Sequence, residues 1–477
     1  MFFKWTSAPR REMSSAKGLD MARDIDLLYL ADPDLASQSL HAGGVNPAAA
    51  MEKARLVARA ATALSQAAVS GPADAYWIPG RIEVLGKHTD YAGGHSVLAA
   101  AERGFCFVAA ARTDRRISVT EAGGGESVSF EIDPDLVPRA NYWANYPMTV
   151  TRRLARNFPS FRRGADIAFA SDLPPAAGMS SSSALLVGSY LALAAINDLE
   201  EDGQYGQNID STLRLAEYLG TIENGQSFGT LAGDRGVGTF GGSEDHTAIL
   251  CCRPGRLSRY AYCPTRFQEQ VTLPAAYTFV VGASGVMAEK TGAAQEKFNR
   301  ASRLAGAVVD LWNEATGNAD PHLAAIVERG ADACGQLERM LAGAQGAGFS
   351  GQELLNRFAH FYAENGEIIP AAMAALDGGD VKSFGAAVDR SQELGARLLG
   401  NQVPETVDLA ALAREEGAVA ASAFGAGFGG SVWALVEERE SQSFSQRWRS
   451  AYLARFPSHS ERARFFVTAA GPAAFRL

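Results

Sequence analysis

Four consecutive serines, Ser180 to Ser183, follow a loop of small residues and lead directly into an apolar run that favours a helix. Backbone N–H groups at the start of a helix are unpaired, and the helix dipole is positive there, so such a segment can hold a phosphate group. Gly178 has no Cβ and lets the backbone approach a ligand closely. An ordinary helix cap needs only one serine, so we predict a phosphate-binding loop. It is not a Walker loop, because no Gly-Lys-[Ser/Thr] follows.

A second polar segment, residues 79–94, reads Pro-Gly-Arg-Ile-Glu-Val-Leu-Gly-Lys-His-Thr-Asp-Tyr-Ala-Gly-Gly. Alternation at Ile82 and Val84 predicts a short strand. The strand leads into a turn that we expect to expose its polar side chains, which are Lys87, His88, Thr89 and Asp90. Such a turn can present several hydrogen-bonding groups to one polyhydroxylated ligand. A salt-bridged surface turn without a ligand explains the segment equally well.

Two acids and a third glycine-rich segment complete the candidate chemistry. Asp245 follows Gly-Gly-Ser-Glu and can act as a general base, and Glu223 can bind a metal ion. Residues 425–430 read Gly-Ala-Gly-Phe-Gly-Gly and precede a predicted strand, where glycines permit close backbone contact. Each feature alone is weak evidence for a site.

Taken together and in order, these segments resemble the motifs of the GHMP kinase superfamily, and within it most closely those of the galactokinase family. The first motif corresponds to Pro79–Arg81 with Gly86–Tyr91, the phosphate motif to Leu173–Ala184, and the third to Gly425–Gly430. The resemblance extends from about residue 50 to the C-terminus. It implies an α+β fold of two GHMP kinase domains with the active site between the lobes.

The resemblance also implies roles for individual residues. Asp245 would take the proton from the anomeric hydroxyl of a sugar, supported by Arg81. The sugar would lie against Lys87, His88, Thr89 and Asp90. ATP would be bound by Gly178, Ser180, Ser181, Ser182 and Ser183, with Mg²⁺ held by Ser182 and Glu223. Phosphoryl transfer depends mainly on positioning and charge neutralisation, which these residue types can supply.

Several positions depart from the family pattern. Lys87 replaces an acid, Glu83 an asparagine and Ser183 an alanine. A glycine-rich insertion lies near residues 232–239, and Phe298 aligns with a tyrosine that lines the sugar pocket in the family. We consider two explanations for Lys87: a charge pair with Glu83 that leaves the substrate unchanged, or a contact with the C6 carboxylate of a hexuronic acid.

These observations predict an ATP-dependent sugar 1-kinase of galactokinase type that acts on galactose or a related sugar. A uronic acid or arabinose 1-kinase is the enzymatic alternative, and a catalytically silent sugar sensor is the non-enzymatic one. Retention of Arg81, Glu223 and Asp245 disfavours the silent sensor. The exact sugar and the oligomeric state stay open.

The composition agrees with a globular enzyme. The 477 residues are 47% hydrophobic and 20% charged, with a net charge of −9, which disfavours a nucleic-acid-binding protein. We also find neither a membrane span nor a signal peptide, so we expect a cytoplasmic protein with no membrane partner. Five cysteines without a CxxC pair predict reduced thiols.

The elements expected to position the site divide the chain into three. We predict an extension over residues 1–45, an N-terminal domain over 46–275 and a C-terminal domain over 276–477. Asn46 and Pro47 are typical of a helix start. We predict a strand pair over residues 97–111 with a turn at Arg103–Gly104, and a hairpin over 117–132.

Overall fold

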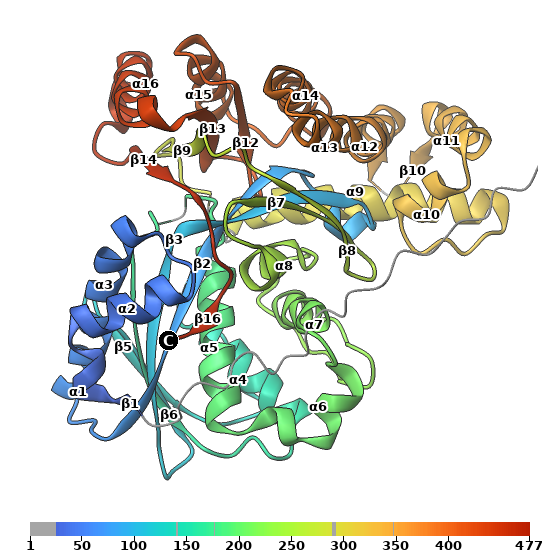
Figure 1. Ribbon diagram of the computed structural model, residues 1–477. Coiled ribbons are helices and arrows are strands. Elements are labelled where there is room, and N and C mark those ends of the chain that lie inside the picture. Colours follow the sequence, from blue (N-terminus) through green and yellow to red (C-terminus); the bar gives the residue numbers. More distant parts are fainter. Residues whose placement is uncertain (1–24, 140–141, 176, 289–291, 347) are drawn as a thin grey trace, which may run out of the picture.

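The computed structural model describes residues 25–139, 142–175, 177–288, 292–346 and 348–477. Figure 1 shows two parts, one around a large sheet and one of helices around a smaller sheet. This is the predicted α+β class.

In the part of the chain that the structure describes, the large sheet has ten strands. Its main path runs in the order β1 (Ile25–Asp26), β2 (Pro72–Leu85), β3 (His95–Ala111), β6 (Ala165–Ser171), β4 (Arg116–Glu121) and β5 (Ser127–Glu131). The pair β4 and β6 is parallel, and its neighbours are antiparallel. β7 (Arg256–Ala261) pairs with β3 and with β8 (Arg266–Thr272). The hairpin predicted over 117–132 is confirmed as β4 and β5.

The predicted turn at Arg103–Gly104 is wrong, because β3 continues through it. Gly104 lies opposite Pro79, and a Cβ at this glycine would stand 2.2 Å from Ile78 O. The glycine therefore permits close approach of β2 and β3 rather than a reversal of the chain.

Helices cover both faces of the large sheet. On one face lie α1 (Leu27–Leu30), α2 (Pro33–Ala42) and α3 (Pro47–Gln66), whose apolar side chains pack with Trp77 and Cys106. On the other lie α4 (Asn145–Asn157), α5 (Ser181–Ile196), α6 (Gly203–Asn208), α7 (Thr212–Asn224) and α8 (Glu244–Cys251). There α5 packs with Ile78 and Phe107. The predicted start of α3 is confirmed, since Asn46 Oδ1 accepts from Ala48 N at 3.0 Å.

The described part of the predicted extension belongs to this first part. β1 pairs with β2, and Leu27, Leu30 and Leu40 are buried in the same cluster as α3. Burial of these leucines explains why residues 25–45 join the sheet layer instead of forming a separate appendage. Residues 1–24 lie outside the described residues.

The second part holds an antiparallel sheet whose described strands run in the order β12 (Ala420–Phe424), β13 (Ser431–Glu437), β9 (Tyr277–Ala283) and β14 (Arg464–Thr468). Its helices are α9 (Gly292–Thr316), α10 (Leu323–Glu328), α11 (Ala331–Gly343), α12 (Gly351–Ala363), α13 (Ile369–Asp377), α14 (Val381–Leu394), α15 (Pro404–Glu415) and α16 (Ser441–Arg455). β10 (Gln345–Gly346) and β11 (Phe349–Ser350) form a separate short pair.

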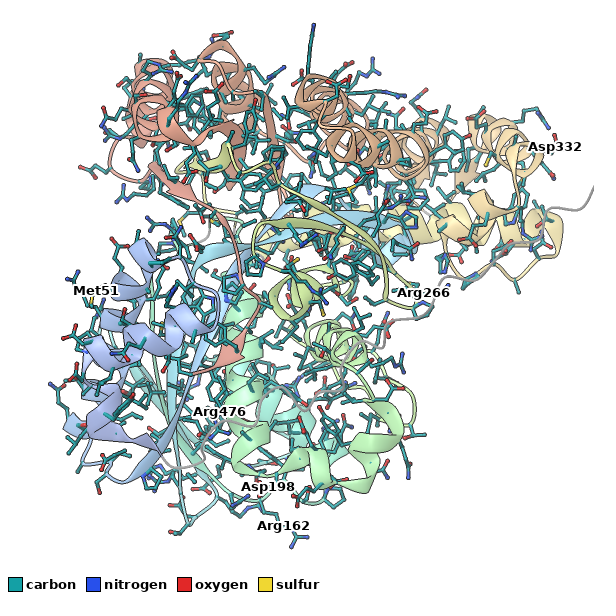
Figure 2. The ribbon with its side chains drawn as sticks, viewed as in Figure 1. Met51, Arg162, Asp198, Arg266, Asp332 and Arg476 are labelled. Atoms are coloured by element: carbon teal, nitrogen blue, oxygen red, sulfur yellow. The ribbon has the colours of Figure 1, made fainter. Side chains whose placement is uncertain are left out.

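The C-terminus returns to the large sheet. β15 (Ala470–Gly471) pairs with β3, and β16 (Phe475–Arg476) pairs with β2. Arg476 forms an ion pair with Asp74 and lies in the same part of the molecule as Met51, whereas Asp332 marks the far end of the helical layer (Figures 1 and 2). The last residues of the predicted C-terminal domain, from β15 onwards, therefore belong to the first part of the molecule. The predicted boundary at 275/276 falls in the loop between β8 and β9, where the chain changes sheets.

In the described ranges, no helix is both long and apolar enough to cross a membrane.

Candidate active site

A pocket opens where both parts of the molecule meet. The residues that line it are Arg81, Glu83, His88, Asp90, Tyr91, Glu223, Asn224, Gly241, Gly242, Glu244, Asp245, His246, Phe298, Gly425 and Ala426. They come from the end of β2 and the turn after it, α7, the start of α8, α9, and the loop between β12 and β13. The pocket thus brings together three of the four motifs found in the sequence.

Arg81 and Asp245 form the centre of the site. Arg81 Nε donates to Asp245 Oδ1 at 2.7 Å, and Nη1 donates to the carbonyl of Gly178 at 2.9 Å. Burial alone lowers the pKa of Arg81, but the charges of Asp245, Glu83 and Glu244 outweigh this and raise it. The guanidinium therefore stays charged and joins the candidate base to the serine loop.

Asp245 lies in the first turn of α8, where the helix dipole favours a negative charge. Its side chain is 13% exposed, so it can reach a ligand in the pocket. Its second oxygen, Oδ2, accepts from Ser183 Oγ at 3.2 Å. A partly exposed carboxylate held by two donors is well placed to take a proton from a bound hydroxyl.

The serine loop has the geometry of a phosphate site. Gly178 and Ser180 have positive φ angles of 72° and 58°, and no side chain caps the first turn of α5. Ser180 Oγ is buried, and no described group is hydrogen-bonded to it. Ser181 and Ser182 are partly exposed. The loop also packs against the start of β13, directly after the third motif, because Ser431 Oγ donates to Ala177 O at 2.5 Å.

Ser183 differs from Ser181 and Ser182 in its burial and in its partners. Its side chain is fully buried, and its hydroxyl lies 2.9 Å from Glu223 Oε2 as well as 3.2 Å from Asp245. Of the four serines, Ser183 rather than Ser182 therefore makes this contact with Glu223. The sequence signalled the position only as a departure from the family's alanine.

The expectation that the turn after β2 exposes its polar residues is wrong. Lys87, His88, Thr89 and Asp90 are between 0% and 9% exposed, because the second part of the molecule covers the turn. The turn is tight: Gly86 has φ 107°, and His88 has φ 58°.

Within the described chain, Lys87 is bonded to two serines rather than to Glu83, the charge partner considered from the sequence. Its Nζ donates to Ser391 Oγ at 3.0 Å and to Ser422 Oγ at 2.8 Å, and it is not among the pocket-lining residues. No ion pair within 4 Å joins it to Glu83 in the described chain. Ser391 also donates to Glu364 Oε1 at 2.9 Å, and this oxygen accepts from Gly86 N at 2.8 Å. Lys87 thus belongs to a buried network that anchors the turn to α14 and β12.

Of the other three residues of the turn, Thr89 stabilises the turn itself, and His88 and Asp90 line the pocket. Thr89 is fully buried, and its hydroxyl lies 2.8 Å from Gly86 O and 2.6 Å from His95 O, so it stabilises the turn. Asp90 lines the pocket, and its Oδ2 accepts from Gly242 N at 3.0 Å. His88 also lines it, with Nδ1 2.8 Å from the Tyr91 hydroxyl.

Phe298 occupies the pocket wall, as its alignment predicted. Its ring centroid lies 5.2 Å from that of His88 and 6.5 Å from that of Tyr91. The inserted loop leads to this wall. Asp234 is held by Arg152 Nε at 2.7 Å, and Asn299 Oδ1 accepts from Phe240 N at 2.9 Å.

The comparisons with known proteins fit this geometry. The model of the GHMP kinases N-terminal domain matches residues 145–234, and that of the GHMP kinases C-terminal domain matches residues 372–454. The chain belongs to the GHMP kinase superfamily. A galactokinase galactose-binding signature also matches residues 75–112 of this GHMP kinase, which contain β2 and the turn after it.

Relatives named galactokinase support the same placement within the superfamily. The chain is 28% identical to a galactokinase of Roseiflexus over 78% of its own length and 86% of the relative's. It is 27% identical to a galactokinase of Enterococcus faecalis over 79% of its own length and 89% of the relative's. The fold is similar to the crystal structure of Lactococcus lactis galactokinase complexed with galactose, with a TM-score of 0.69, 21% identity and coverage of 85% of this chain and 95% of that one. The family and the two-domain fold predicted from the sequence are confirmed.

Proposed function

We propose that the protein is an ATP-dependent kinase that transfers the γ-phosphate of ATP to the anomeric hydroxyl of galactose or a related neutral sugar. The single observation that carries this proposal is Arg81, which joins Asp245 in the pocket to Gly178 in the serine loop. One side chain thereby connects a candidate base, next to the galactose-binding signature, with a candidate phosphate site. The galactokinase relatives support the same class of enzyme, an ATP-dependent carbohydrate kinase.

In this proposal the chain's own residues mainly position the reactants. Asp245 accepts the proton of the anomeric hydroxyl, and Arg81 holds Asp245 while offsetting negative charge between base and phosphate. The free N–H groups at the start of α5 bind phosphate oxygens. His88, Asp90 and Phe298 line the space for the sugar.

The residues present fit a magnesium ion bound together with ATP. Mg²⁺ in kinases is commonly held by one or two protein ligands plus the phosphates of the substrate. Glu223 supplies a buried carboxylate, and the partly exposed Ser182 and the buried Ser183 supply hydroxyls on the adjacent helix. When bound, the ion neutralises charge on the phosphates.

The charges of the pocket favour a neutral sugar over a uronic acid. Five carboxyl groups line it, and Arg81 is the one lysine or arginine among the described lining residues. Since Arg81 is already paired with Asp245, a hexuronate carboxylate would find no free cation there. Lys87, the other candidate partner, is bound to two serines outside the pocket.

A transfer screen tests the proposal. We expect labelled phosphate to pass from ATP to galactose or another neutral sugar, and not to galacturonate or glucuronate. Arabinose and N-acetylated hexosamines belong in the same screen. Transfer to none of these sugars would overturn the kinase assignment and favour a silent sensor, whereas a preference for uronates would overturn the neutral-sugar assignment.

A further inference from the structure

Two buried glutamates meet at the inner wall of the pocket. Glu83 lies in β2 and Glu244 opens α8, so 160 residues of sequence separate them, yet both line the pocket and are 4% and 5% exposed. Arg81 lies between them, with its nearest nitrogen 3.9 Å from a carboxylate oxygen of each. This pair is distinct from Asp245, the candidate base.

One carboxylate oxygen of Glu83 has no hydrogen-bond partner among the described residues. Oε2 accepts from Gly425 N at 3.2 Å. Oε1 is buried, and no hydrogen-bond donor of the described residues reaches it. The carboxyl group of Glu244 lies next to Glu83 beside Arg81, and a hydrogen bond between two carboxyl groups requires that one of them carries a proton.

The surroundings of the pair favour one shared proton. Burial and the proximity of Glu83 and Asp90 raise the pKa of Glu244 well above its ordinary value. Burial also raises the pKa of Glu83, although Arg81 and Lys87 oppose this. Asp245 acts on both glutamates, and Tyr262 faces Glu244 from the segment after β7. Two ionised carboxylates in contact would repel each other strongly in such a buried place.

We propose that Glu83 and Glu244 form a hydrogen-bonded carboxyl pair that determines which sugar is bound, by accepting a hydrogen bond from a neutral sugar hydroxyl. The inference rests on the proposed kinase function. Once Glu244 donates to Glu83, its other oxygen still accepts, and the pair keeps one negative charge next to Arg81. A hydroxyl can donate to this pair. A sugar carboxylate cannot donate, and it would add a second negative charge.

The proposed pair of Glu83 and Glu244 predicts different effects of Ala and Gln variants on sugar binding. Glu83→Ala or Glu244→Ala removes one member and leaves the other without its partner, so the KM for the sugar should rise about tenfold to a hundredfold while the KM for ATP is unchanged. Glu83→Gln or Glu244→Gln should recover most of this loss, because the amide N–H replaces the shared proton. The Gln variants should also keep their sugar affinity at alkaline pH, where the natural pair loses its proton.

The experiment combines steady-state kinetics with calorimetric titration of galactose, from pH 6 to 9. Glu102→Gln is the control, because Glu102 is a less buried carboxyl that also has a raised pKa but accepts from Asn46 N, away from the pocket. Ala variants with an unchanged sugar KM, or Gln variants as impaired as the Ala variants, would overturn the proposal.

Binding and transfer separate this inference from the function on which it rests. If galactose binds but no phosphate is transferred, the kinase function fails, and the role of the pair is still decided by the binding constants. If phosphate is transferred and the Ala variants bind the sugar normally, the pair fails and the kinase function stands. If the natural protein binds no neutral sugar, both are overturned.

Discussion

Ser183 Oγ stands between two carboxylates, 2.9 Å from Glu223 Oε2 and 3.2 Å from Asp245 Oδ2. The hydroxyl is fully buried and couples the candidate metal ligand to the candidate base. His246 approaches the same Glu223 oxygen with Nε2 at 3.3 Å. The centre of the site is thus a connected set of groups rather than a single aspartate.

Ser183→Ala should lower kcat by about tenfold to a hundredfold, the equivalent of one hydrogen bond to a charged group. The reason is that Asp245 and Glu223 both lose the donor that fixes their orientation. Steady-state kinetics at several Mg²⁺ concentrations measure the effect. Ser189→Ala is the control, because this buried serine of α5 donates to Leu185 O and touches neither carboxylate. Equal kcat values for the two variants would contradict the role of Ser183.

Arg81→Lys should lower kcat by about a hundredfold, in the range found when one charge-stabilising donor is removed. A lysine carries a single donor centre and cannot bind Asp245 and Gly178 O at the same time as the guanidinium does. Steady-state kinetics measure the fall in kcat, and circular dichroism checks that the variant is folded. A kcat near that of the natural protein would show that Arg81 does not support the base.

Lys87→Met should lower the free energy of unfolding by about 1.5–3 kcal/mol, the loss expected for hydrogen bonds to a buried charge. The ratio of activity on galactose to activity on galacturonate should stay unchanged, because Lys87 lies outside the pocket. Denaturant unfolding and the two-sugar assay test both parts. If the activity ratio shifted towards galactose while the stability stayed unchanged, the result would contradict the structural role and support a contact between Lys87 and a uronate.

Glu244 should make the stability of the protein fall as pH rises. Its pKa is raised in the folded chain, so between its ordinary pKa and the raised one the folded state binds more protons than the unfolded state. Stability is therefore greatest below the ordinary pKa and declines above it. Glu244→Gln removes this penalty, so its advantage in Tm over the natural protein should grow from pH 5 to pH 8. An advantage that is constant over this range would contradict a raised pKa.

The sequence was most informative where the cause is local. Asn46 and Pro47 start α3 through their own backbone and side chains, and the serine run begins α5 as predicted. The motifs indicate Asp245 and Arg81, and the structure places them in contact. Gly178 was selected for its missing Cβ. Its φ of 72° adds a second reason, since any substitution there strains the backbone as well as crowding a phosphate.

The sequence was least informative where partners are distant. Lys87 is bonded to Ser391 and Ser422, which lie more than 300 residues further along the chain. From the sequence alone, the buried turn that contains Lys87 therefore resembles an exposed one. Similarly, nothing near Phe475 indicates that the chain returns to β2, and nothing near Glu244 indicates that it shares Arg81 with Glu83. These relationships are set by the packing of both parts of the molecule.

Asp245→Asn gives the most direct test of the account. The amide keeps the shape of the side chain but is a far weaker base, so turnover of galactose should fall by about a hundredfold or more while ATP still binds. Phosphate-transfer kinetics and calorimetric titration of ATP on the same preparation measure the two quantities. Retained ATP affinity with lost turnover is the predicted result; turnover close to that of the natural protein would contradict the assignment of Asp245 as the base.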